Sequence, residues 1–237
     1  MKMKLIAATL CTLLTTHAYC ASNPASTTYV DNAINNYKNS VLNLKIGDFY
    51  QGGVVFYLDS TNQHGLTAAI TDQTNLATST FKWTETGSDV AFRTGAAATG
   101  VGGGALNTPI IVAVQAGVNP EAVNYAARRA LIWEVLEDGL TQCDGELADP
   151  VPNCYGGWYL PAASELQVMI QNIEQVNATS ISHGGSALVE NQFYWSSSER
   201  GGAASVSTTA WAVNSSTGLA RGFTKSVLYP VRAIRSF

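Results

Sequence analysis

The chain has 237 residues, of which 46% are hydrophobic and only 13% are charged. Disordered chains combine low hydrophobicity with high charge, so this composition excludes an intrinsically disordered protein. Seventeen acidic residues outnumber thirteen basic ones, which excludes a general nucleic-acid binder, because such proteins need excess cations against phosphate. The length is sufficient for a domain with a substantial hydrophobic core.

Residues 1–20 have the pattern of a secretory signal peptide. Two lysines in the first four residues precede an apolar run over 5–14, and residues 18–20 resemble a cleavage site. We expect cleavage after Cys20, with lipidation of Cys20 as the alternative, which the bulky Tyr19 before it disfavours. No later run has the roughly 18 apolar residues that span a bilayer. The mature protein is therefore expected to be secreted and to act outside the cell or at its surface.

Residues 21–45 are expected to form a polar linker and a short stalk. Apolar residues recur there at intervals of four and three, the spacing of a coiled-coil heptad, at Val30, Ile34, Tyr37, Val41 and Leu44. The pattern favours association with other copies of the chain, and the bulk of Tyr37 favours a trimer over a tight dimer. The alternative is an amphipathic helix packed against its own domain.

The main domain, 46–237, begins with a predicted hairpin of strands 53–58 and 66–70. Residues 84–108, rich in Gly, Ala and Thr, are expected to be a loop. We predict a helix capped by Asn119 that ends near Gly139, then a second helix after Pro161. Four strands complete the chain as a late antiparallel sheet, over 193–197, 209–213, 220–224 and 228–235. The predicted fold class is α+β.

Two cysteines, Cys143 and Cys154, remain after export. An even, closely spaced pair in an oxidising compartment predicts a disulfide. Zinc is the alternative, but neither His64 nor His183 stands at ligand spacing from the pair.

The segment between the cysteines is acidic. Asp144, Glu146 and Asp149 supply the hard oxygen ligands that suit calcium. The alternative is a solvated acidic loop held by its disulfide, because the spacing fits no calcium-loop template. No other metal or cofactor is expected.

Six segments carry a family resemblance. They are IGDFYQGGVVFYLD (46–59), GVGGGALNTPIIV (100–112), GGWYLPAASEL (156–166), YWSSSE (194–199), AWAVNSSTG (210–218) and YPVRAIRSF (229–237). In this order they resemble the C-terminal domain of the Legionella collagen-like adhesin, a family of secreted bacterial domains. The resemblance implies a C-type-lectin-like fold, trimers and binding of sulfated glycosaminoglycans. This sequence lacks the collagen repeats of the adhesin, and the stalk could replace them as the trimerising element.

Candidate ligand-binding residues are aromatic and basic. Trp158, Trp195 and Trp211 are expected in the core, although an exposed tryptophan could instead stack on a sugar. Basic residues concentrate in the last part of the chain, at Arg200, Arg221, Lys225, Arg232 and Arg235. They could attract sulfate as a local patch. Alternatively, these cations pair with acids of the first half of the chain.

Catalytic motifs are weak. Ser79 and Lys82 match an S-x-x-K pattern without its companion motifs, and both His64 and His183 adjoin glycines in expected turns. We therefore expect a non-catalytic adhesion module at the bacterial surface that recognises glycans as an oligomer. A structural or protein-binding surface component is the alternative, and a hydrolase is the least expected.

Overall fold

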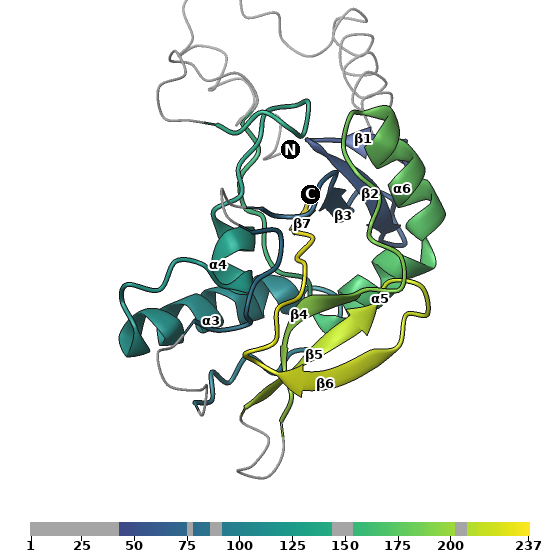
Figure 1. The fold of residues 1–237 in the computed structure, drawn as a ribbon. Helices are drawn as coiled ribbons and strands as arrows, with labels where there is room; N and C mark the ends of the chain where they lie inside the picture. The colour runs from purple at the N-terminus through teal and green to yellow at the C-terminus, as the bar shows by residue number, and fades with distance from the viewer. Residues whose placement is uncertain (1–42, 75–77, 86–91, 144–153, 202–207) are drawn as a thin grey trace, which may run out of the picture. The chain divides into compact units, whose positions relative to one another are not determined.

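The computed structural model describes residues 43–74, 78–85, 92–143, 154–201 and 208–237. The expected signal peptide, the linker and all of the heptad pattern except Leu44 lie outside these residues, as do the acidic residues of the expected calcium site. The chain from Leu44 to Phe237 forms one compact unit of helices and two antiparallel sheets (Figure 1). The predicted α+β class is confirmed.

The first sheet has the order β1-β2-β3-β7. Its strands are β1 (Phe49–Tyr50), β2 (Gly53–Leu58), β3 (Gly65–Ala69) and β7 (Ile234–Ser236). Strands β2 and β3 pair as an antiparallel hairpin, as predicted. The first four residues of the apolar run of β2 are buried. The last strand is shorter than predicted and does not join the late sheet. It pairs instead with β3, with Arg235 opposite Thr67, so the two ends of the domain meet in one sheet.

The second sheet has the order β4-β5-β6. Its strands are β4 (Phe193–Glu199), β5 (Thr209–Asn214) and β6 (Ala220–Thr224), close to the predicted ranges. Large and small residues face each other across the pairs. Trp195 lies opposite Ala212, and Phe223 lies opposite Ala210. The small partners leave room for the rings on the same face of the sheet.

Helix α3 (Gly103–Val118) and helix α4 (Ala126–Leu131) correct two predictions. Of the expected helix over 119–138 only the short α4 is present, and Asn119 ends α3 instead of starting a helix. The supposed loop over 84–108 includes the first turns of α3. No side chain at the N-terminus of α3 caps it, so the local sequence carries no start signal.

The cap of α3 comes from a distant carboxylate. Glu165 is buried and accepts the backbone N–H groups of Gly102 at 2.8 Å and Gly104 at 3.0 Å. It also accepts the N–H of Ala162 at 2.7 Å, at the start of its own helix. A Cβ on Gly104 would lie 2.5 Å from Glu165 Oε2, so only glycine permits this approach. One side chain therefore serves two helix N-termini, where unpaired N–H groups favour an anion.

The helix predicted after Pro161 is present as two segments, α5 (Ala163–Gln171) and α6 (Ile173–Ser182). The break falls at Asn172, whose side-chain amide donates to Phe56 O at 3.0 Å and Val168 O at 3.2 Å. Helix α5 contacts both sheets, and α6 packs on β2 (Figure 1). Within the described residues, no helix is long and apolar enough to cross a bilayer.

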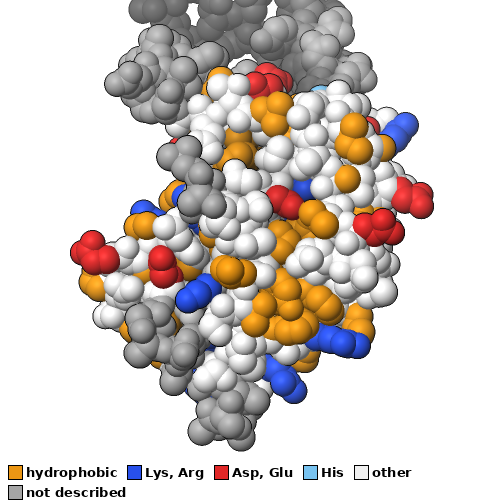
Figure 2. Space-filling model, in the orientation of Figure 1, with side chains coloured by type: hydrophobic (Ala, Val, Ile, Leu, Met, Phe, Trp, Pro, Cys, Tyr) orange, Lys and Arg blue, Asp and Glu red, His pale blue; other side chains and the backbone are white. Residues whose placement is uncertain are grey.

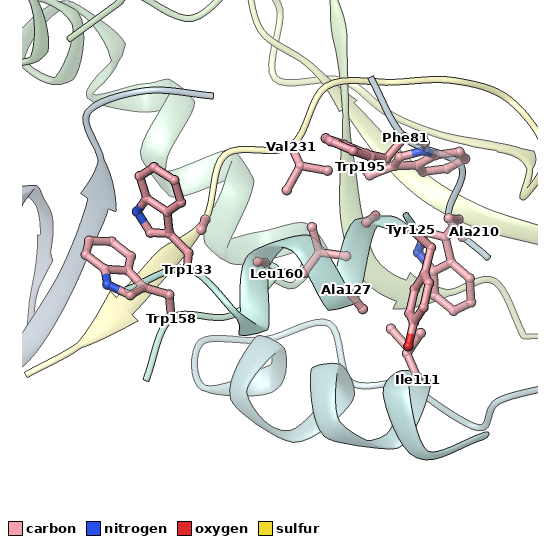
Figure 3. Close-up of a cluster of buried hydrophobic side chains, with 14 of the residues drawn as sticks. Phe81, Ile111, Tyr125, Ala127, Trp133, Trp158, Leu160, Trp195, Ala210 and Val231 are labelled. Atoms are coloured by element: carbon pink, nitrogen blue, oxygen red, sulfur yellow. Dashed lines mark hydrogen bonds between the residues drawn. The ribbon is translucent and has the colours of Figure 1, made fainter. Parts of the chain in front are cut away.

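The described core forms two clusters of buried side chains. One contains Trp83, Trp158 and Trp195 together with small residues of α4 and β5. Figure 3 shows Trp158 and Trp195 of this cluster. The other joins β2 and β3 to α5 and β4 through Phe56, Leu166 and similar residues. The three indoles are fully buried, and rings of this size contribute the largest buried areas in a core.

Candidate functional site

The five basic residues expected to form a patch do not share one surface. Lys225 and Arg232 are fully buried, Arg235 is partly buried, and Arg200 and Arg221 are exposed. On the face shown in Figure 2, Lys and Arg side chains are scattered singly. Lys225 and Arg232 therefore do not reach a surface ligand, and the expected cationic site reduces to Arg200 and Arg221.

Lys225 belongs to a buried ion pair with Glu199. Its Nζ also donates to Phe92 O at 2.9 Å and lies 4.6 Å from the centroid of the Trp83 ring. Glu199 accepts the backbone N–H of Thr94 at 3.1 Å. Burial lowers the pKa of Lys225, and its contacts with Glu199 oppose that shift. This pair joins the segment around residues 92–95 to the ends of β4 and β6.

Arg232 belongs to a second buried network. Its Nε donates to Asp72 Oδ1 at 2.7 Å, and its other nitrogens donate to Ala69 O at 3.0 Å and Ser186 O at 3.1 Å. The Tyr194 hydroxyl donates to Asp72 Oδ2 at 2.8 Å. Burial, and then the charge of Asp72, raises the pKa of Tyr194. Arg232 thus pairs with an acid of the first half of the chain, as the alternative interpretation had it.

The two exposed arginines lie on different faces of the second sheet. The Arg200 guanidinium lies 5.4 Å from the ring centroid of Trp211, which is partly exposed. Trp211 pairs with Gly222, whereas Arg221 pairs with Ala212. Neighbouring residues of a strand point to opposite faces, so Arg221 cannot join Arg200 and Trp211 in one site.

The remaining candidates have structural contacts. Trp195 and Trp158 are core residues, and their Nε1 atoms donate to Phe81 O at 2.9 Å and Tyr155 O at 2.8 Å. Trp195 is therefore not available for stacking on a sugar. His64 is exposed in the β2–β3 turn, and His183 is exposed at the end of α6. In the described chain, no group of three or more His, Cys, Asp or Glu lies close enough to hold a metal ion.

A pocket of about 760 Å³ opens beside the Arg232 network, and we call it the main pocket. Small-molecule sites typically have volumes of about 300–1,000 Å³. Its described lining comes from four separate segments and consists of Thr71, Asp72, Thr74, Ser79, Thr80, Trp133, Leu140, Gln142, Ser186, Val189, Gln192 and Pro230. Apart from Asp72, every one of these side chains is uncharged.

Several polar side chains of this lining are uncommitted. Within the described residues, the side chains of Thr71, Thr74, Ser79, Gln142 and Ser186 have no hydrogen-bond partner. A hydroxyl both donates and accepts, and an amide side chain does the same through two atoms. These groups are therefore free to bind a ligand that carries many donors and acceptors.

Other lining residues are apolar. Leu140 and Val189 are exposed, with 39% and 55% of their surface accessible, whereas Trp133 and Pro230 are buried. Trp133 is also a member of the first core cluster (Figure 3). An aromatic ring and aliphatic side chains next to uncommitted hydroxyls suit a ligand with both apolar and polar faces.

The pocket walls are held by interactions behind them. Asp72 has both oxygens engaged by Arg232 and Tyr194, and the Tyr194 hydroxyl accepts the N–H of Val189 at 2.7 Å. The predicted disulfide is confirmed, between Cys143 and Cys154. It adjoins Gln142 in the chain, so it restrains that wall of the pocket. This arrangement fixes the walls before any ligand binds, which lowers the entropy cost of binding.

The sequence did not indicate the main pocket. Its walls come from residues around 71–80, 133–142, 186–192 and 230, and none of these segments has a binding motif. In the sequence, Ser79 belongs only to the S-x-x-K pattern that lacks its companion motifs. No protein-family model and no curated protein matches this chain.

Proposed function

We propose that this chain is an exported, non-catalytic binding module that recognises surface glycans through the main pocket. The observation that carries the proposal is the lining itself. Uncommitted hydroxyl and amide groups line a volume of about 760 Å³ together with aliphatic side chains and a largely buried aromatic ring. Sugars present the same pair of features, hydroxyls on the edge and apolar C–H groups on the ring faces.

The charges of the pocket favour an uncharged glycan. Asp72 is already paired with Arg232, and the described lining holds no exposed cation. A sulfated or acidic sugar would bring an anion close to Asp72 without a partner, and burying an unpaired charge is costly. The family resemblance suggests sulfated glycans. We retain a glycan as the ligand but propose an uncharged one.

The test is binding of the purified chain to an array of neutral and sulfated glycans, followed by calorimetry on the best neutral ligand. Replacing Ser79 and Gln142 by Ala removes two uncommitted polar groups and is expected to weaken binding about tenfold. The matched control replaces Ser60 and Gln63, which are exposed in the β2–β3 turn. Absence of binding to every neutral glycan, or equal losses in both double variants, would refute the proposal.

A second candidate is a protein-binding surface component, and helix α3 favours it. Its sequence contains no charged residue, and Leu106, Ile110 and Val118 are 65%, 40% and 52% exposed. Apolar groups gathered on an exposed helix often mark interaction sites. Adhesion to protein-coated surfaces that persists at high salt and is lost in a Leu106→Asn/Ile110→Asn variant would favour this function over glycan binding.

A further inference from the structure

The lining of the main pocket contains two chemically different sets of side chains, which alternate along the same segments. Ser79, Gln142 and Ser186 offer uncommitted polar groups, whereas Trp133, Leu140 and Val189 offer apolar surface. A plain sugar carries hydroxyls on nearly every ring carbon. These hydroxyls match the polar side chains of the lining, but the sugar offers only ring C–H groups to the aliphatic ones.

An acetamido substituent would contact both sets of side chains at once. Its methyl group is apolar and suits a surface such as Leu140 and Val189, because burial of apolar groups is favourable. Its amide has one donor and one acceptor, and the Gln142 side chain offers the complementary acceptor and donor. Both Leu140 and Gln142 are exposed in the same short stretch before Cys143.

The electrostatics of the pocket point the same way. The acetamido group is neutral, so it needs no cation, and the only charged side chain of the described lining is Asp72, paired with Arg232. A free amino sugar would carry a positive charge and would compete with Arg232 for Asp72. A sulfamido or carboxylate group would meet Asp72, and the described lining itself holds no cation to oppose it.

We propose that the main pocket is selective for N-acetylated, uncharged amino sugars, through contact of the acetamido methyl with Leu140 and Val189 and of its amide with Gln142. This inference rests on the proposed glycan-binding function and narrows its ligand class. It concerns binding only, and no bond is made or broken.

The experiment is calorimetric titration of the purified full chain with two matched disaccharides, N,N′-diacetylchitobiose and cellobiose. They share the β1,4 linkage and the glucose configuration and differ only in the 2-acetamido groups. We expect diacetylchitobiose to bind at least about tenfold more tightly, because one buried methyl and one or two further hydrogen bonds favour it. Chitosan dimer, which carries amines in place of acetamides, serves as a third probe and is expected to bind no better than cellobiose.

Variants test whether Leu140 and Gln142 carry this selectivity. Leu140→Asn is expected to remove most of the preference for diacetylchitobiose and to leave cellobiose binding nearly unchanged. Leu219→Asn is the matched control, since Leu219 is 49% exposed and lies outside the lining. Gln142→Glu is expected to weaken binding of diacetylchitobiose, because it removes the amide donor. Gln63→Glu is its control.

The outcomes separate the two proposals. Equal binding of both disaccharides, or stronger binding of cellobiose, overturns the selectivity and leaves glycan recognition standing. A preference that survives Leu140→Asn overturns the assignment to this pocket. Absence of binding to all three probes overturns the selectivity, and the glycan array then decides whether the wider function fails as well.

Discussion

Replacing Lys225 by Met is expected to destabilise the domain strongly. The side chain of Lys225 is fully buried, and that of Glu199 is 6% exposed. The substitution keeps the length and the apolar stem of the side chain while removing its charge. It leaves the Glu199 carboxylate buried, with backbone N–H groups such as those of Thr94 and Gly95 as its remaining partners.

The expected cost is about 3–5 kcal/mol, the range found when one partner of a buried pair is removed. The substitution also removes the cation–π contact between the Lys225 ammonium and the Trp83 ring, whose centroid lies 4.6 Å away. The energy of this contact is not added to that of the ion pair, because the two share the same ammonium group. In a domain of this size, 1 kcal/mol corresponds to a shift in Tm of about 2–4 °C. The variant should therefore melt at least about 6 °C below the parent chain.

The assay is urea unfolding followed by tryptophan fluorescence and by circular dichroism, with the double variant Lys225→Met/Glu199→Gln included. The double variant removes both charges and should cost no more than the single Lys225→Met variant, because no unpaired charge remains. Lys45→Met is the surface control, since Lys45 is exposed, and should change stability by less than about 0.5 kcal/mol.

Two results would refute this reasoning. A loss below about 1 kcal/mol for Lys225→Met would mean that the pair contributes no more than a surface ion pair. A double variant clearly less stable than Lys225→Met would mean that the Glu199 carboxylate is not left unpaired by the loss of Lys225.

Three further predictions concern other parts of the domain. Glu165→Gln should cost about 1–3 kcal/mol, because one amide oxygen replaces two carboxylate oxygens as acceptor for three N–H groups. Burial raises the pKa of Glu165 from 4.5, so the carboxyl group stays protonated to a higher pH in the folded state than in the unfolded state. The difference in free energy of unfolding between parent and variant should therefore decrease as the pH rises above 4.5. A difference that stays constant with pH in urea titrations would contradict the raised pKa. Replacing both Cys143 and Cys154 by Ala should cost about 3 kcal/mol for so short a loop and weaken ligand binding at the adjoining wall; an unchanged melting temperature would show that the disulfide adds nothing. Retention on heparin should be weak and no lower in an Arg200→Ala/Arg221→Ala variant, and strong, salt-sensitive retention that this variant loses would restore a sulfated ligand.

Several local features were predictable because the signal and the structure lie in the same short segment. Strand β6 spans Ala220–Thr224 as predicted, and the β2–β3 hairpin is marked by an apolar run and turn residues. The disulfide between Cys143 and Cys154 was likewise predictable, since it needs only spacing and an oxidising compartment. Alternation and turn chemistry act between neighbours in the chain, so one sequence suffices to detect them.

Helix α3 was missed because its start depends on a residue far along the chain. Glu165 provides the cap that Gly102 and Gly104 lack locally, and the Gly-rich composition therefore predicted a loop. The final strand was assigned to the wrong sheet for a similar reason. Its pairing with β3 joins residues near both ends of the domain, and no local pattern encodes such a partner.

The sequence by itself determined the fold class, most strands and the disulfide, because propensity, alternation and spacing are local properties. Only the tertiary structure decided which chemically capable residues are accessible. Lys225, Arg232 and Trp195 had the right chemistry for a glycan site and are buried in the interior. Ser79, Leu140 and Gln142 had no motif and meet in the main pocket. Burial and convergence arise from contacts between distant segments, and those contacts exist only in the folded chain.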